Sequence, residues 1–215
     1  MNKLPKEWSD VATGQFIELT RILERSYSTE LDRNIDLLAT LKNTTRAEIE
    51  AMRISDIKAD VRQTAFLSDI SSMPTALPAF FTLKGKLYDV QLDITKITGY
   101  QLIDLMSFTR VPSEIPQNIH NIMAVMAIPR RYFWKKGSYS GDRHPQLAQL
   151  FYERLPITIS RPLALFFWNV WSNLPGGIVD CSLEKLRETE YEMQKVMKNL
   201  KQSKTLTVSR INTVG

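Results

Sequence analysis

The segment with the most distinctive chemistry is a run of cationic and aromatic side chains. Four cations flank three aromatic rings in this run: Arg130, Arg131, Tyr132, Phe133, Trp134, Lys135 and Lys136. Cations bind phosphate groups and aromatic rings stack on bases, so the run could contact nucleic acid. Trp, Tyr and Arg also dominate the energetics of protein interfaces. Three interpretations stay open: a contact with a partner protein, a contact with nucleic acid, or a surface loop whose rings fold back onto the domain.

Residues suited to catalysis or metal binding are sparse elsewhere. His120 and His144 lie far apart in the chain, and neither has a second His or Cys near it, which argues against a zinc site. Cys181 has no neighbour in sequence that would activate a thiolate. Asp89 and Asp93 alternate along a predicted strand, which is typical of its solvated side. The sequence contains no nucleotide-binding, zinc-protease or serine-hydrolase motif. We therefore predict no catalytic site, no metal, no cofactor and no enzyme activity.

Composition indicates a globular chain. Of the 215 residues, 43% are hydrophobic and 24% are charged, which is enough apolar material to bury a core. The formal net charge of +5 is compatible with an acidic partner without requiring nucleic acid. A single cysteine rules out an internal disulfide and favours a reducing compartment. The N-terminal residues lack the apolar run of a signal peptide, and the apolar run Leu163–Trp171 is too short for a bilayer, so we expect no membrane span.

Hydrophobic periodicity predicts a series of amphipathic helices. They are expected to start near Thr13 and near Ser55, and to cover Asp32–Leu41, Arg46–Met52, Ile97–Phe108, Ile119–Ala127, Gln146–Arg154, Arg161–Ser172 and Leu183–Lys201. Thr45 and Glu48 have the spacing of a capping box. Pro129 is expected to end one helix, and Pro162 suits the first turn of another.

Between these helices the period changes to that of a strand. Val90, Leu92 and Ile94 alternate with polar residues after Lys84-Gly85-Lys86, which predicts a β-hairpin. The predicted fold is therefore mainly α (α+β), a helical bundle with a central hairpin. We divide it into an N-terminal helical half (1–72), a linker and hairpin (73–96), a second helical half with the basic aromatic loop (97–177), and a C-terminal helix with an extended tail (178–215).

Two stretches of the chain resemble each other. Val11–Leu19 aligns without a gap on Ile97–Leu105, with identities at Gln15/Gln101, Ile17/Ile103 and Leu19/Leu105. Farther along, Met52–Ser55 resembles Leu155–Thr158. Either the chain contains two related helical halves, or amphipathic helices share this pattern by chance. Related halves would favour an architecture built for binding surface over one built around a catalytic cleft.

The C-terminal segment is a candidate for contacts between subunits. Its predicted helix carries an apolar stripe, and its tail is nearly uncharged. Packing of the helix on its own domain is the alternative. The tail could instead add a strand to the sheet edge of a neighbouring subunit. The expected oligomer contacts are Leu186, Met193, Met197, Leu200, Leu206, Val208 and Ile211.

Several short motifs follow one another along the chain: Trp8–Val11, Gly14–Leu19, Leu37–Ala39, Ala47–Glu50, Leu83–Val90, Leu92–Ile94, Ile97–Gly99 and Ala124–Pro129. In this order residues 8 to 175 resemble small virion-associated proteins of tailed bacteriophages, particularly the crAss-like phages. The resemblance implies a structural protein of the tail or the head–tail connector ring. Our first hypothesis places the protein in the virion, after assembly in the bacterial host cytoplasm, with contacts to other virion proteins and to further copies of the chain. A tail-assembly chaperone that leaves the particle and a nucleic-acid-binding module are the alternatives.

Overall fold

The computed structural model describes residues 3–130 and 137–172. Six of the seven residues of the basic aromatic run, Arg131 to Lys136, lie outside this part of the chain. So does the predicted C-terminal segment with Cys181 and every expected oligomer contact: Leu186, Met193, Met197, Leu200, Leu206, Val208 and Ile211.

The first four helices form what we call the first helical unit. After a 3-10 turn at Trp8–Asp10 come α1 (Thr13–Glu24), α2 (Glu30–Lys42), α3 (Arg46–Glu50) and α4 (Ile54–Gln63), followed by 3-10 turns at Thr64–Ser68 and Ile70–Ser72. The predicted capping box begins α3, because Thr45 Oγ1 accepts from the Glu48 N–H at 3.3 Å while Glu48 Oε2 accepts from the Thr45 N–H at 2.9 Å. Asn43, in the left-handed region at φ 47°, ends α2.

The hairpin is present and is part of a three-stranded antiparallel sheet. Strands β1 (Phe80–Leu83), β2 (Lys86–Val90) and β3 (Ala127–Pro129) lie in the order β1-β2-β3. Lys84 and Gly85 both have positive φ (47° and 72°), as the two central residues of a tight hairpin turn require. Strand β3 was not predicted from the sequence.

The predicted second strand was too long. It ends at Val90, so Leu92 and Ile94 do not belong to it. The Gln91 N–H still donates to the Met126 carbonyl in the register of the β2–β3 pair. The chain then turns away, where Asp93 Oδ1 accepts from the Thr95 N–H at 3.0 Å and a 3-10 turn forms at Ile94–Lys96.

The last four helices form the second helical unit. They are α5 (Gly99–Thr109), α6 (Ile115–Met126), α7 (His144–Arg154) and α8 (Ile157–Ser172), with 3-10 turns at Pro112–Glu114 and Gly141–Arg143. Helix α6 ends at Met126, before the predicted end, because the chain continues directly into β3. Helix α8 begins four residues before the predicted start, so Pro162 is inside the helix and not in its first turn. The residues at its start are β-branched and have a lower helix propensity, so the sequence did not predict this turn as part of the helix.

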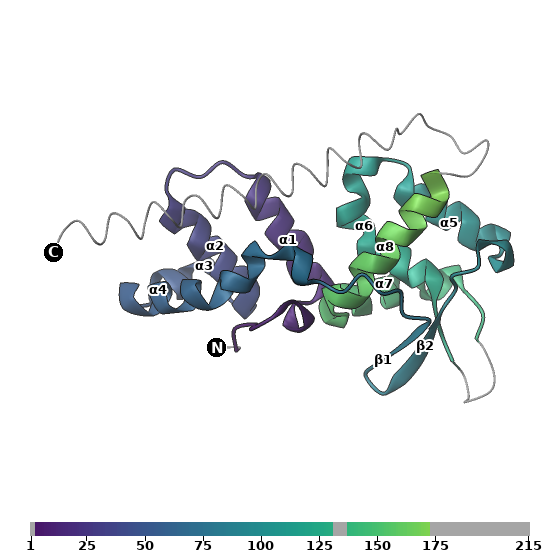
Figure 1. Ribbon diagram of the computed structural model, residues 1–215, viewed down its shortest axis with the longest axis horizontal. Coiled ribbons are helices and arrows are strands. Elements are labelled where there is room, and N and C mark those ends of the chain that lie inside the picture. Colours follow the sequence, from purple (N-terminus) through teal and green to yellow (C-terminus); the bar gives the residue numbers. More distant parts are fainter. Residues whose placement is uncertain (1–2, 131–136, 173–215) are drawn as a thin grey trace.

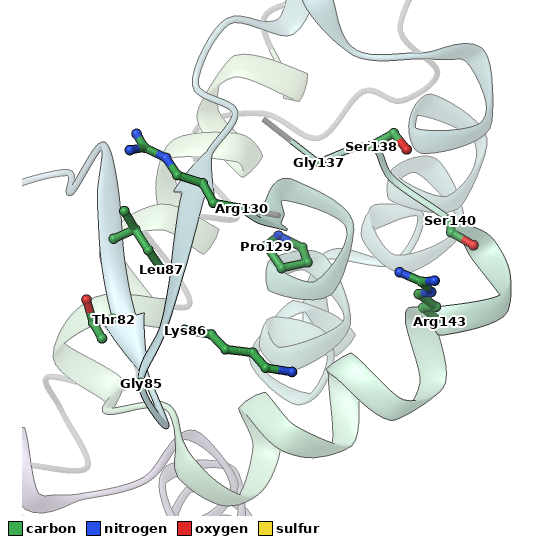
Figure 2. A pocket seen from close by; sticks show the side chains of 10 residues that line it. All are labelled: Thr82, Gly85, Lys86, Leu87, Pro129, Arg130, Gly137, Ser138, Ser140 and Arg143. Atoms are coloured by element: carbon green, nitrogen blue, oxygen red, sulfur yellow. The ribbon is translucent and has the colours of Figure 1, made fainter. Parts of the chain in front are cut away.

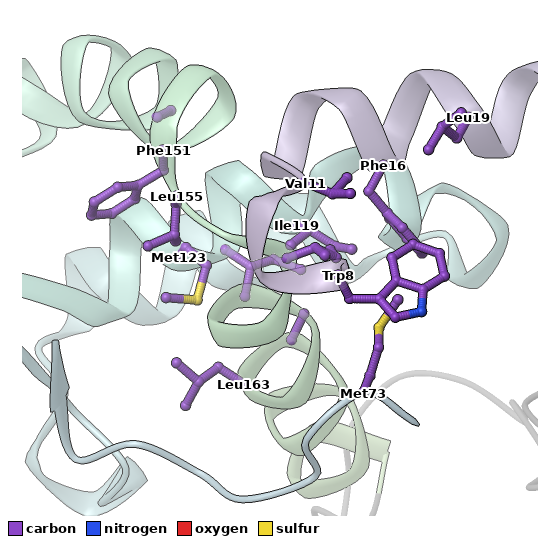
Figure 3. Close-up of a cluster of buried hydrophobic side chains, with 14 of the residues drawn as sticks. Trp8, Val11, Phe16, Leu19, Met73, Ile119, Met123, Phe151, Leu155 and Leu163 are labelled. Carbon is purple, nitrogen blue, oxygen red and sulfur yellow. The ribbon is translucent and has the colours of Figure 1, made fainter. Parts of the chain in front are cut away.

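Helix α6 is the centre of the hydrophobic core. Its residues from Ile122 to Met126 are buried, and it packs against α1, α5, α7 and α8. The buried cluster draws on both helical units, and Figure 3 shows Trp8 and Phe16 of the first unit beside side chains of α6, α7 and α8. The prediction of a mainly helical α+β fold with a hairpin is confirmed.

Helix α1 joins the two units. Figure 1 places α2, α3 and α4 at one end of the molecule and α5 to α8 at the other, with α1 between them. It packs on α2 of its own unit and on α6, α7 and α8 of the second. The backbones are bonded there: the Thr13 N–H donates to the Leu155 carbonyl at 2.8 Å, and the Ile157 N–H donates to the Val11 carbonyl at 2.9 Å. We call this contact the internal joint.

Candidate functional site

The two stretches that resemble each other make the same hydrogen bonds. Gln15 is the third residue of α1, and its Oε1 accepts from the Ala12 N–H at 3.0 Å while its Nε2 donates to the Leu41 carbonyl near the end of α2 at 2.9 Å. Gln101 is the third residue of α5, and its Oε1 accepts from the Thr98 N–H at 3.1 Å while its Nε2 donates to the Val125 carbonyl near the end of α6 at 3.0 Å. Each glutamine therefore ties the start of one helix to the end of the next.

The order and packing of the helices also recur. In the first unit α2 packs against α1, α3 and α4; in the second unit α6 packs against α5, α7 and α8. The second pair of similar segments, Met52–Ser55 and Leu155–Thr158, lies at the junctions between α3 and α4 and between α7 and α8. The sequence similarity therefore coincides with equivalent positions in two four-helix arrangements.

The two units differ in what covers their first helix. The face of α1 that carries Thr13 and Gly14 lies against α7 and α8, and Ile17, one turn farther along, is 1% exposed. The corresponding face of α5 is open, with Tyr100 81% exposed and Ile103 64% exposed. Large apolar side chains gathered on one open helix face are typical of interaction surfaces. We call Tyr100 and Ile103 the α5 face.

A basic cleft lies between the hairpin and residues 137–143. It encloses about 890 Å³ and is lined by Thr82, Gly85, Lys86, Leu87, Pro129, Arg130, Gly137, Ser138, Ser140 and Arg143. Three of these side chains are cationic and none is acidic. Figure 2 shows Lys86 and Arg143 extending into the space between the hairpin and the loop. Two cations with serine hydroxyls nearby can bind the oxygens of an anion such as a phosphate group.

Arg130 is the one residue of the basic aromatic run that the structure describes, and it is held in an ion pair. Its Nε donates to Asp89 Oδ2 at 2.7 Å and its Nη2 to Asp89 Oδ1 at 2.6 Å, so the pair is bidentate. These hydrogen bonds raise the pKa of the Arg130 guanidinium. Asp89, which the sequence suggested was only on the solvated side of a strand, therefore fixes Arg130 at the cleft wall. The cations extending into the cleft in Figure 2, Lys86 and Arg143, were not singled out from sequence, because the fold brings them together from distant segments.

The histidines pack against aromatic rings. His120 lies edge-on to Tyr152 with ring centroids 5.2 Å apart, and His144 stacks on Phe108 with centroids 5.1 Å apart. Burial, followed by the nearby His144 and Arg21, lowers the pKa of His120 to about 4, so its imidazole is neutral at pH 7. No cluster of three or more His, Cys, Asp or Glu that could hold a metal occurs within residues 3–130 and 137–172.

The fold and these surfaces define a class of protein: a mainly helical chain with a repeated four-helix arrangement, a small antiparallel sheet, a basic cleft and an open apolar helix face. Comparisons with protein-family models, curated proteins and solved structures found no match. Over the described residues, no helix has both the length and the apolar character needed to cross a membrane.

Proposed function

We propose that this protein is a structural component of a tailed-phage virion, of the tail or the head–tail connector ring, and that it works through protein–protein contacts without enzymatic activity. The observation that carries the proposal is the α5 face, where Tyr100 is 81% exposed and Ile103 is 64% exposed. The equivalent face of α1 is buried within the same chain, so among the described residues the repeated arrangement contains one covered helix face and one exposed helix face.

The resemblance of residues 8 to 175 to virion-associated proteins gives the proposal its biological setting, with a virion location after assembly in the host cytoplasm. Other virion proteins and further copies of the chain are the proposed partners. The C-terminal helix and tail belong to the same proposal as contacts between subunits, with the residues from Leu186 to Ile211 named above. In the alternative of an assembly chaperone, the same face binds an unassembled protein and then releases it.

The test is the mass of the purified full-length chain in solution, measured by light scattering after size exclusion. We expect a discrete oligomer, and we expect Ile103→Glu to reduce its mass toward that of a single chain because a carboxylate in an apolar contact carries a large desolvation cost. Leu77→Glu is the matched control, since Leu77 is 39% exposed and lies in the segment before β1. A wild-type chain that stays monomeric at every concentration would count against self-assembly and favour the chaperone.

The basic cleft supports a second candidate function, the binding of nucleic acid through its phosphates. Lys86 and Arg143 extend into a cleft that has no acidic side chain among its described lining residues. Affinity for a single-stranded oligonucleotide should then fall steeply with salt, and Lys86→Ala/Arg143→Ala should lower the salt slope by roughly 1.4, about 0.7 for each lost phosphate contact. Lys58→Ala/Arg62→Ala on α4 removes the same charge far from the cleft. If the two double variants bind the oligonucleotide with the same affinity and the same salt slope, the cleft does not bind nucleic acid.

A further inference from the structure

The internal joint shows how one helical unit of this chain contacts another. Thr13 Oγ1 lies 2.8 Å from the Leu155 carbonyl and 2.7 Å from Ser160 Oγ, and residues Ala12 and Pro156 form an isolated antiparallel bridge. Ile157, the first residue of α8, is fully buried at this joint, and its N–H donates to the Val11 carbonyl. We call the α1 face with Ile17 the donor side of the joint and the α7–α8 junction with Ile157 its receiving side. These two names describe the docking of the surfaces and not the direction of the hydrogen bonds.

Each side of the joint has a counterpart elsewhere in the chain that is exposed. The counterpart of Ile17 is Ile103, which is 64% exposed on α5. The counterpart of Ile157 is Ile54, the first residue of α4, which is 54% exposed. The N–H groups in the first turn of a helix have no acceptor within that helix, and the Ile54 N–H is one of them. The equivalent Ile157 N–H donates across the internal joint. Within residues 3–130 and 137–172, the chain thus carries one filled joint and exposed counterparts of both of its sides.

From this arrangement we infer that the α5 face of one copy docks on the α3–α4 junction of a second copy, with Ile103 against the surface around Ile54. The inference rests on the proposed function, because it names the partner of the α5 face. The two patches differ and lie on different helical units, so the contact is heterologous, and copies join head to tail into a ring or a filament.

The second joint, between copies, differs from the internal joint in the size of the side chain that α5 presents at the position of Gly14. In the internal joint Gly14 lets α1 approach Tyr152, since a Cβ at that position would lie 2.5 Å from the Tyr152 ring and 2.7 Å from its carbonyl oxygen. On α5 the position of Gly14 is occupied by Tyr100, which is 81% exposed, whereas the counterpart of Tyr152 on the receiving side is Ile49, which is fully buried within its own unit. The Tyr100 ring therefore belongs with Ile103 to the exposed surface that docks around Ile54, and Ile49 takes no part in the contact.

Complementation between two variants tests this inference. Ile103→Glu removes the donor patch, and Ile54→Glu removes the receiving patch. Both changes affect exposed side chains, so each variant should fold and give a wild-type circular dichroism spectrum. Each variant alone should have the mass of a single chain. When the two variants are mixed, one intact donor patch meets one intact receiving patch. We expect the mixture to give a species of twice the single-chain mass and nothing larger, while Leu77→Glu assembles like the wild type.

Two outcomes would overturn the inference. If the mixed variants stay single chains, the contact uses the same patch on both copies and is not head to tail. If Ile54→Glu alone assembles like the wild type while Ile103→Glu does not, the receiving surface is elsewhere, and only the proposed self-assembly stands. A cysteine pair gives an independent readout: in a Cys181→Ser background, Ile103→Cys and Ile54→Cys on separate chains should form a disulfide-linked dimer on oxidation, and its absence would contradict the contact.

Discussion

The side chain of Gln101 satisfies two backbone groups at once. It is 2% exposed, accepts from the Thr98 N–H and donates to the Val125 carbonyl, which α6 cannot satisfy so near its own end. Gln101→Met keeps the shape and removes both hydrogen bonds. We expect it to lower the free energy of unfolding by about 1–3 kcal/mol, the usual cost of a buried polar group left unpaired. Urea denaturation followed by circular dichroism measures this.

The matched variant for that change is Gln15→Met, which removes the equivalent bonds in the first unit. Gln15 is only half-buried, so water can replace part of what is lost and the destabilisation should be smaller. A larger loss for Gln15→Met than for Gln101→Met would show that burial does not set the cost of these two bonds.

His120 should make the stability of the protein depend on pH. Its pKa is about 4 in the folded chain, because burial and the neighbouring His144 and Arg21 disfavour the imidazolium, and its ordinary value of 6.5 applies when the chain is unfolded. Between these values the unfolded chain binds the proton and the folded chain does not. The contribution of neutral His120 to stability is therefore complete above pH 6.5, declines as the pH falls from 6.5 to about 4, and declines no further below that.

His120→Phe keeps an aromatic ring against Tyr152 and removes the titrating group. We expect the urea midpoint of the wild type to fall between pH 6.5 and about 4 by more than that of His120→Phe, with the difference between the two isolating His120 from the carboxylates that titrate nearby. Parallel pH profiles for the two proteins would mean that His120 is solvated and protonates in the folded chain.

At the scale of the helix, the internal joint depends on the missing side chain of Gly14. A Cβ there would lie 2.7 Å from the Tyr152 carbonyl oxygen, and backbone cannot rotate away as a side chain can. Gly14→Ala should therefore destabilise the protein by about 2 kcal/mol, despite the helix propensity of alanine. Gly99, at the first position of α5, has open space around it, and a Cβ added there would meet no heavy atom within 4 Å. Gly99→Ala should therefore be neutral or stabilising by up to about 1 kcal/mol. Equal effects of the two changes on the thermal midpoint would contradict the close packing of α1.

The elements that sequence predicted well are those with a local signal. Periodic apolar residues placed the helices, the Thr45–Glu48 pair marked the start of α3, and Lys84-Gly85 marked the hairpin turn. Strand β3 has no such signal, since its three residues continue the apolar run of α6 and become a strand only by pairing with β2. The basic cleft was also out of reach of sequence, because Lys86 and Arg143 come from segments separated by two helices and a strand.

At the scale of the whole molecule, the two helical units share one core. Val11 and Thr13 of the first unit and Leu155 and Ile157 of the second are fully buried where they meet, and the backbone hydrogen bonds between them cross the joint in both directions. A unit separated from the other would expose these side chains and lose these bonds. Neither unit is therefore expected to be stable alone, although each contains four helices.

Splitting the chain between the units tests this expectation. Residues 1–78 and residues 79–215, produced separately, should each lack a cooperative urea transition, and mixing them should restore the helical signal at a ratio of one to one, because association refills the internal joint. A folded chain can also be cleaved at the same place, through a protease site inserted at residues 74–78. Its two fragments should then elute together on size exclusion. If residues 1–78 alone unfold cooperatively with the free energy of the full chain, α1 does not depend on α6, α7 and α8, and the internal joint would be a contact between two independent domains.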